Sequence, residues 1–468
     1  MFRGVNSSNL YKYIAFSFFA VWMLFVGFFS NHWSATRDFK DFAMSSESLV
    51  IGRLAKSEQD GVLSAAGLLG WFYDFPSEAA NIPGQYDIYL EKLEGRLFRT
   101  YNGQVGFQGI CFSLIDLITD LPHETNLKLF KGITAFLSAV SFTLIILWFI
   151  GQFGFLIGFI LLLFLTSSSL TTSLGRNLYW QLWAFYVPMI ASMVLLAREE
   201  RKGYSHAIAS AALFIAVLVK CLFNGCEYIT TTLIMMIVPF FYYAIQRRWT
   251  LGMFLKRASV AGVTAIISVL SSFSVLVLQI SIIKGSYKSG YDHIIYSFLK
   301  RTHGSPADFP SVYAKSLDAP LLDVLEKYFN GPVISLRSIF QNDSLFEINL
   351  GQMIVMFSAS TALFFLLKNR AISIKSNEEK LLPLVITTWA SILAPMSWFT
   401  IFKAHSYIHP HINNITWFMP FVLFGLVFSF SMPCLILTNA LQYLKQRFLC
   451  FASAPITRDN RIRQEQEK

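Results

Sequence analysis

Residues 132–175 read GITAFLSAVSFTLIILWFIGQFGFLIGFILLLFLTSSSLTTSLG and contain no Asp, Glu, Lys, Arg or His. A bilayer has a hydrocarbon core about 30 Å thick, so a spanning helix needs roughly 20 mostly apolar residues. Two helices therefore fit into this stretch, and the Gly-Gln-Phe-Gly segment at 151–154 predicts the turn between them. The segments should be helices, because an unpaired backbone group in lipid costs several kcal/mol.

Apolar stretches of similar length continue on both sides. The first of them, Tyr13–Phe29, has a basic flank like a signal peptide but no small-residue cleavage site after it, which favours an uncut anchor. Together with the central pair, they predict an all-α polytopic membrane bundle of about ten transmembrane helices. The eight further spans are Tyr13–Phe29, Leu178–Ala197, His206–Asn224, Tyr228–Gln246, Ala258–Ile283, Ile348–Leu367, Leu381–Phe402 and a segment within Ile412–Leu444.

The composition agrees with lipid as the solvent. Only 14% of the residues are charged and 54% are hydrophobic, whereas about 25% are charged in a typical soluble domain. The five cysteines are scattered and form no CxxC pair. Their spacing therefore predicts neither a disulfide framework nor a zinc site.

The basic residues predict the orientation. With both termini cytoplasmic, the inner segments hold 19 Lys and Arg against 7 Asp and Glu, and the outer segments hold 19 against 21. This is the positive-inside pattern of multi-pass membrane proteins. The net charge of +10 is therefore interpreted as topology and contact with anionic membrane lipids, not as a nucleic-acid interface.

Two outer segments are long, at about 31–130 and 284–347. The first is expected to be helical in places, for example at Ser46–Lys56 and Asp87–Thr100. Residues 1–445 form the predicted transmembrane domain. Residues 446–468 form a charged cytoplasmic tail that is predicted to be disordered.

The first outer segment contains Glu58-Gln59-Asp60 followed by Gly61. Two carboxylates beside a flexible glycine can converge on one divalent cation such as Mg²⁺ or Mn²⁺. A carboxylate that is partly desolvated near the membrane can also act as a general base. The alternative is a solvated charged turn.

Three further short segments carry candidate binding residues. Arg176 is the one charge between Lys131 and Arg198, and a guanidinium group suits phosphate. The neighbouring Tyr179 is a candidate pocket residue, although aromatic residues at a span boundary are often interface anchors. Lys220 and Glu227 lie within or near the hydrocarbon, where ionisable groups are costly and often functional. They can equally form a structural pair that closes the hairpin.

The last outer loop, KAHSYIHPHINN at 403–414, is rich in histidine. It can bind phosphate through lysine and protonated imidazole or ligate a metal, and the alternative is an ordinary polar loop at the interface. The second long segment adds another basic cluster. The candidates here are Lys403, His405, His409 and His411 in the loop, and Lys300, Arg301 and His303 in the cluster.

These groups all fall in outer loops under the single topology that the basic residues indicate. We therefore expect them to meet in one pocket at the outer leaflet, with Asp60 facing the cations. Acidic and basic groups at a membrane surface suit a reaction on a phosphate-bearing lipid, because the cations can hold the anionic leaving group.

The architecture and the Glu58-Gln59-Asp60 motif resemble the GT-C class of membrane glycosyltransferases. Members have a cytoplasmic N-terminus and an acidic motif in a large first outer loop, and they use polyprenyl-phosphate-linked sugars as donors. The resemblance implies Asp60 and Glu58 as base or metal ligands. It implies transfer, with inversion, to a hydroxyl of a glycan, lipid or protein on the non-cytoplasmic face. The segments at 176–180 and 403–409 also resemble uncharacterised bacterial members found with surface-polysaccharide genes, which implies the bacterial inner membrane.

Three other functions remain open at this stage. A polysaccharide polymerase of the O-antigen type would use the same helices and cations but would not need the acidic motif. A flippase or transporter for lipid-linked sugars is disfavoured, because transporters tend to place charges at the midplane and to show inverted repeats. A non-catalytic scaffold remains if the loops do not converge.

Overall fold

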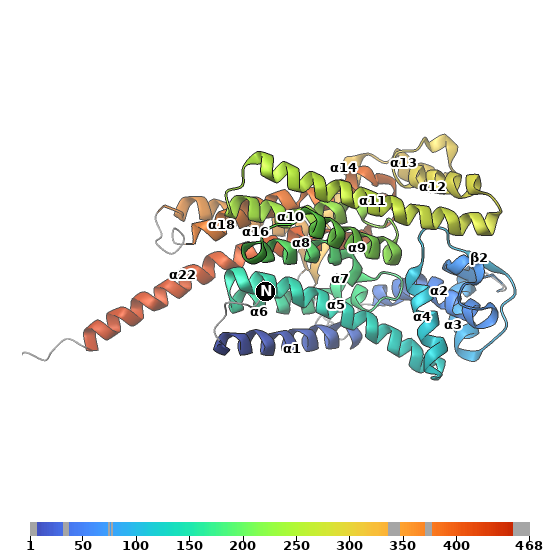
Figure 1. The fold of residues 1–468 in the computed structure, drawn as a ribbon, viewed down its shortest axis with the longest axis horizontal. Coiled ribbons are helices and arrows are strands. Elements are labelled where there is room, and N and C mark those ends of the chain that lie inside the picture. The colour runs from blue at the N-terminus through green and yellow to red at the C-terminus, as the bar shows by residue number, and fades with distance from the viewer. Residues whose placement is uncertain are drawn as a thin grey trace, which may run out of the picture.

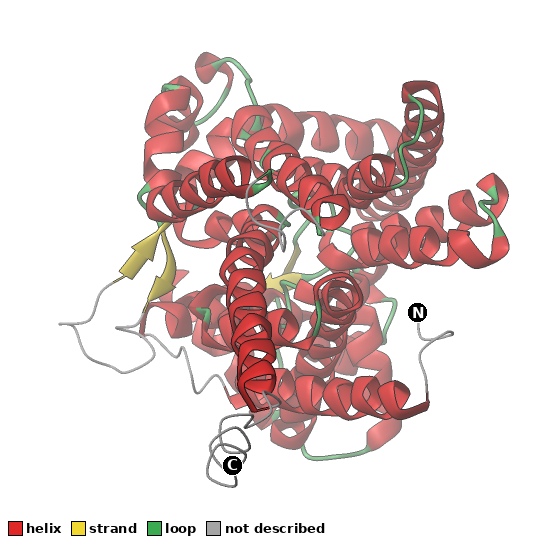
Figure 2. Cartoon of the chain, turned by 90° about the vertical axis from the view of Figure 1, so that its left-hand side faces the viewer, coloured by secondary structure: helices red, strands yellow, loops and turns green. Residues whose placement is uncertain are grey.

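The computed structural model describes residues 7–30, 37–73, 75, 78–335, 347–369 and 377–452. Nearly all of the regular structure is helical, and the helices of the bundle run side by side along the long axis (Figure 1). Two antiparallel pairs of short strands interrupt them (Figure 2).

The predicted multi-pass helical architecture is confirmed. Eight helices or helix pairs are long and apolar enough to cross a membrane, and two bent pairs bring the number to as many as ten among the described residues. The first group comprises α1 (Ser7–Ser30), α5 (His123–Phe153), α8 (Leu182–Lys202), α9 (His206–Asn224), α10 (Ile229–Gln246), α11 (Leu251–Lys284), α16 (Leu350–Leu367), and α18 (Glu378–Ser391) with α19 (Leu393–Ile401). The bent pairs are α6 (Phe155–Ser167) with α7 (Ser169–Gly175), and 410–418 with the first part of α22 (Phe421–Ala452).

The stretch at 132–175 folds back as predicted, but with a shorter turn. Helix α5 continues to Phe153, and Gly154 alone reverses the chain with a φ of 91°. The second half is bent by 72° at Ser168. At the bend the Thr171 hydroxyl donates to the carbonyl oxygen of Leu165 at 2.8 Å, and the Thr172 hydroxyl donates to that of Ser168 at 2.8 Å. Such side-chain bonds let a helix break in an apolar setting, because they satisfy the freed backbone groups.

The described parts of the two long segments lie at the same end of the bundle, which we call the large-loop end (the described residues within 37–122 and 286–349; on the right in Figure 1). The opposite end is the short-loop end. The first segment contains α2 (Arg37–Asp60), η1 (Ser64–Gly67), β1 (Gly70–Phe72), α3 (Glu78–Glu91), β2 (Phe98–Thr100) and α4 (Phe107–Thr119). The second contains α12 (Tyr287–Arg301), η2 (Pro306–Asp308), α13 (Ser311–Asp318), α14 (Leu321–Phe329), β3 (Pro332–Ser335) and β4 (Glu347–Asn349).

Two predictions for irregular regions need correction. The stretch Ser46–Lys56 lies in α2 as expected, but the helix predicted at Asp87–Thr100 ends at Glu91. The chain leaves it at Lys92, which has a φ of 57°, and Phe98–Thr100 then pairs with β1 as a strand. Residues 446–452 of the predicted disordered tail belong to α22, and 453–468 lie outside the described residues.

Buried polar contacts hold the first large segment on the bundle. The guanidinium group of Arg53 is fully buried and donates to the hydroxyl of Ser57 and to carbonyl oxygens of Gly61 and Val62. The carboxylate of Glu47 pairs with Lys131 at 3.1 Å and accepts the Leu178 backbone N–H. Arg53 thus orders the turn that follows α2, whereas Glu47 fixes the middle of α2 and the loop before α8 relative to α5.

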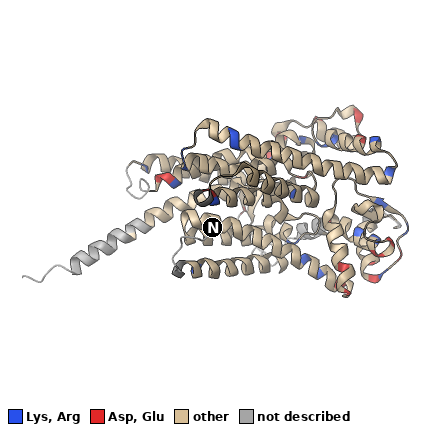
Figure 3. Ribbon diagram, viewed as in Figure 1, with Lys and Arg blue, Asp and Glu red and all other residues tan. Residues whose placement is uncertain are grey.

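Charged side chains are concentrated toward the two ends of the molecule (Figure 3). At the short-loop end, Glu199, Arg247 and Arg257 form a partly buried charge cluster. One carboxylate oxygen of Glu199 lies 2.7 Å from Arg247, and the other lies 2.7 Å from Arg257. This cluster joins α8 to α10 and α11.

Replacing Glu199 with glutamine should destabilise the bundle. Two guanidinium groups would then face each other without their shared carboxylate, at a cost of roughly 2–3 kcal/mol. Thermal unfolding of the purified protein measures this. Glu124→Gln is the control, because its pair with Lys128 is a solvent-exposed contact within one helix. Equal melting temperatures of the two variants would contradict the structural role of Glu199.

Candidate active site

Arg301 lies at the centre of the candidate site, at the C-terminal end of α12. One of its terminal nitrogens is 3.0 Å from a carboxylate oxygen of Glu227, and the other donates to the Tyr101 hydroxyl at 3.4 Å. The Arg301 side chain is 19% exposed and that of Glu227 is 5% exposed. This ion pair joins the turn between α9 and α10 to the second large segment.

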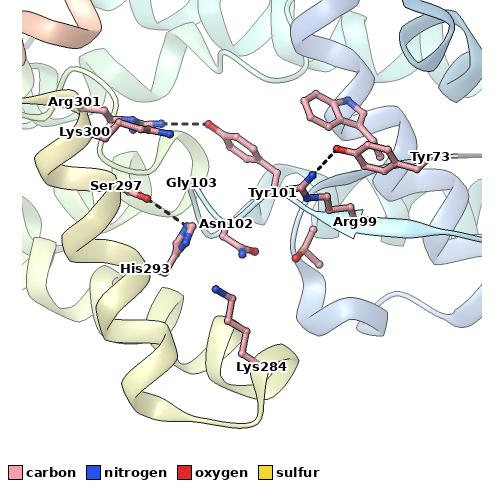
Figure 4. A pocket seen from close by; sticks show the side chains of 12 residues that line it. Tyr73, Arg99, Tyr101, Asn102, Gly103, Lys284, His293, Ser297, Lys300 and Arg301 are labelled. Carbon is pink, nitrogen blue, oxygen red and sulfur yellow. Dashed lines mark hydrogen bonds between the residues drawn. The ribbon is translucent and has the colours of Figure 1, made fainter. Parts of the chain in front are cut away.

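Three cavities have Arg301 in their walls. We call them the histidine cavity, of about 310 Å³, the basic cavity, of about 580 Å³, and the apolar groove, of about 150 Å³. The first two also share Trp71, Tyr101 and Lys300, so they adjoin. The walls of the histidine cavity include Tyr179, Trp180, Glu227, Tyr313, His405 and His409. Those of the basic cavity include Tyr73, Arg99, Lys284, His293 and Ser297 (Figure 4).

The histidine cavity contains an acid–histidine pair. His405 Nε2 lies 3.7 Å from the second carboxylate oxygen of Glu227, and its ring centroid lies 4.7 Å from that of His409. The short helix α20 (Lys403–Ile408) places these two histidines one turn apart, and the ring of Trp398 packs edge-on against His405. Among the described residues, His405 Nδ1 has no hydrogen-bond partner. This nitrogen is buried, so a substrate hydroxyl reaches it only if neighbouring side chains move.

Burial and neighbouring charges separate the protonation states of the pair. Burial acts to raise the pKa of Glu227, but the positive charge of Arg301 opposes it, so this pKa lies below its ordinary value. Burial lowers the pKa of His405 to about 3, and Arg301 adds to this effect. At neutral pH the site thus holds a carboxylate and a neutral imidazole. The expected phosphate binding by a protonated His405 is therefore not supported, because a neutral imidazole carries no charge.

The apolar groove lies beside Arg301 between α10, α11 and α12. Its wall is mostly hydrophobic and includes side chains such as Val269, Phe273, Leu276, Ile294 and Phe298. Helix α11 is one of the candidate membrane spans. The groove therefore extends from the membrane-spanning helix α11 to the guanidinium group of Arg301.

Several of the predicted site residues donate hydrogen bonds to backbone carbonyl oxygens instead of lining one of these cavities. Lys220 is fully buried and donates to the carbonyl oxygens of Gly225 and Glu227 at 2.9 and 2.7 Å. It thereby holds the turn that presents Glu227. The other three bind single carbonyl oxygens. These contacts are Arg176 to Phe29, Lys403 to Leu317, and His303 to Thr400.

The structure does not bring Glu58 and Asp60 into these cavities. Asp60 forms an ion pair with Lys56, one turn earlier in α2, and is 49% exposed. Glu58 instead lies 2.6 Å from His123 Nε2. Of the other predicted site residues, Tyr179, Glu227, Arg301, His405 and His409 meet in the histidine cavity, whereas His411 is not part of its wall.

A metal ion would find a different set of ligands from the predicted Glu58 and Asp60. Ligand atoms of Glu58, Asp116 and His123 lie within 4.8 Å of one another, and carboxylate with imidazole suits several divalent metals. Within this group, however, the Asp116 carboxylate already accepts hydrogen bonds from Tyr89 and Asn126. None of the three residues lines a cavity that contains Arg301.

Sequence reasoning identified Lys300 and Arg301 but missed the rest of the wall of the basic cavity. On α12 the polar residues His293, Ser297 and Lys300 recur at helical spacing and face the cavity together. That periodicity was a usable signal. Tyr101, Arg99 and Trp71 come from the β1–β2 region, for which no sequence pattern predicted strands.

Comparisons with known proteins leave the site to be interpreted from its chemistry. The chain matches no protein-family model, and no curated protein or solved structure gives a significant match.

Proposed function

We propose that the protein is a membrane glycosyltransferase that takes a sugar from a lipid-phosphate donor of the polyprenyl type. The observation that supports this most directly is the position of Arg301, which borders an apolar groove and two polar cavities. A lipid-phosphate sugar has three matching parts: an apolar tail, an anionic phosphate and a polar sugar.

The donor would lie with its tail in the apolar groove and its phosphate at Arg301. A guanidinium group has five N–H donors, so Arg301 can bind phosphate oxygens while it keeps its contacts with Glu227 and Tyr101. Lys300, whose Nζ lies 4.5 Å from the centroid of the Tyr313 ring, borders the same two polar cavities. The sugar would then enter the histidine cavity.

His405 would act as the general base. Its Nδ1 accepts the proton of the acceptor hydroxyl, while its Nε2–H turns toward the Glu227 carboxylate, which stabilises the imidazolium that forms. The hydroxyl oxygen attacks the anomeric carbon, the bond from that carbon to the phosphate oxygen breaks, and the configuration inverts. Arg301 and Lys300 meet the charge that develops on the departing lipid phosphate.

The finer parts of the resemblance belong to the same proposal. They are the GT-C class, a bacterial inner membrane, cytoplasmic termini and a non-cytoplasmic large-loop end. The acceptor would be a hydroxyl of a glycan, lipid or protein. If a divalent cation takes part, Glu58, Asp116 and His123 would hold it.

Transfer by the purified, reconstituted protein tests the proposal. With a polyprenyl-phosphate sugar and a membrane extract as the source of acceptors, we expect release of polyprenyl phosphate together with a glycosylated product. Release of a lipid pyrophosphate together with a lengthening polymer would identify a polymerase instead. Movement of the intact donor across the vesicle membrane would identify a flippase.

Replacing Asp60 with asparagine should leave transfer within about twofold of wild type. The Asp60 pair with Lys56 is half exposed, and exposed ion pairs contribute only about 0.2–1 kcal/mol. The initial rate of transfer at matched protein level measures this effect. A loss of transfer in a folded Asp60→Asn variant would contradict the site at Arg301 and return the role of base to the acidic motif.

A further inference from the structure

The basic cavity contains more positively charged side chains in its wall than the phosphate of the proposed donor would contact. Its walls contain Arg99, Lys284, Lys300 and Arg301, and none of the described residues that line it is Asp or Glu. Arg301 is paired with Glu227, but neither Arg99 nor Lys284 forms an ion pair with a described carboxylate. A cavity lined by charges of one sign concentrates ions of the opposite sign. The cavity is therefore suited to bind an anion.

Aromatic rings form the wall opposite α12. The guanidinium group of Arg99 donates to the Tyr73 hydroxyl at 3.2 Å and lies 5.6 Å from the centroid of that ring. Trp71 is held by a hydrogen bond of 2.9 Å from its indole N–H to Ser48. Figure 4 shows Tyr73, Arg99 and Tyr101 on one side of the cavity, with Lys284 and His293 on the other. Aromatic faces attract the polarised C–H groups of a sugar ring, and the cations bind its acidic group.

The cavity has the size and the position for an acceptor. Its volume of about 580 Å³ lies within the roughly 300–1,000 Å³ range that is usual for ligand pockets. It adjoins the histidine cavity at Trp71, Tyr101 and Arg301. A sugar bound here can therefore direct a hydroxyl toward the donor.

We infer that the basic cavity binds an acidic saccharide, whose carboxylate or phosphate group lies between Arg99 and Lys284. The role of this saccharide as the acceptor rests on the proposed function, whereas its binding does not. A neutral glycan would leave Arg99 and Lys284 without an anionic group to bind.

Binding of trigalacturonate and of its uncharged methyl ester to the full chain, in nanodiscs of phosphatidylcholine, tests this. We expect the acid to bind at least about tenfold more tightly than the ester, as two charged hydrogen bonds allow. Arg99→Gln and Lys284→Gln should each weaken binding of the acid by about tenfold. Lys288→Gln is the control and should change nothing, because Lys288 is exposed on α12 outside the cavity wall.

Equal affinities for acid and ester, or an acid affinity that neither substitution changes, would overturn the inference. So would competition by phosphatidylglycerol in the nanodiscs, since the cavity would then bind a lipid headgroup. The measurement needs no donor and thus separates the two proposals. A protein that binds the acid through Arg99 and Lys284 but transfers no sugar contradicts only the proposed function. One that transfers sugar but binds acid and ester alike contradicts only this inference.

Discussion

Replacing Arg301 with glutamine is expected to reduce kcat for sugar transfer by about 10²–10³-fold, the range for loss of one preorganised group that stabilises transition-state charge. The group borders all three cavities, so the donor should also bind more weakly. Initial rates over a range of donor concentrations measure both effects. Arg301→Lys should recover part of the activity, because it keeps the charge but loses the planar array of donors.

The same substitution should destabilise the protein, and a double variant separates this from catalysis. Arg301→Gln leaves the 5% exposed Glu227 without its ion-pair partner, which costs about 3–5 kcal/mol for a buried pair. Arg301→Gln combined with Glu227→Gln removes both charges and should restore most of the melting temperature without restoring transfer. Transfer at the wild-type rate by this folded double variant would contradict the role of Arg301.

The membrane spans could be predicted because they depend on local composition. An apolar stretch of sufficient length has few alternatives to a helix in lipid. The tight turn between the fifth and sixth predicted spans also appears as expected, with α9 ending at Asn224 and α10 starting at Ile229. The position of Glu227 at the large-loop end follows from that turn.

The partners within the site could not be predicted, because they depend on contacts between distant segments. Arg301 meets Glu227 and Tyr101 from two other loops, and no spacing rule connects the three. Asp60 was expected to face the cations, but α2 continues to this residue and pairs it with Lys56 in its own last turn. The histidines show the same limit on a smaller scale. A helical turn brings His405 and His409 together, whereas His411 follows Pro410 and lies outside the cavity wall.

His405 provides the other large expected effect. If its imidazole accepts the proton from the acceptor hydroxyl, His405→Gln should lower kcat by about 10²–10⁴-fold, the usual contribution of a general base. The glutamine amide can still donate toward Glu227, so folding and donor affinity should change little. His411→Gln is the matched control, since His411 comes from the same loop but is not in the cavity wall, and its transfer rate should stay at the wild-type level.

The pH profile of transfer tests the protonation state of His405 in the functioning enzyme. A base must be unprotonated, and the pKa of His405 is lowered to about 3 by burial and by Arg301. The value of kcat/KM should therefore not fall between pH 8 and pH 5 through protonation of His405, unlike that of an enzyme with an ordinary histidine base, for which it would fall below about pH 6.5. A fall centred near pH 6.5 that disappears in His405→Gln would show that the imidazole is solvated and accessible to protons. That result would contradict the lowered pKa but support His405 as the base, because the pH dependence of kcat/KM reports the essential base of the free enzyme. Wild-type transfer by a folded His405→Gln variant would instead remove His405 from the mechanism.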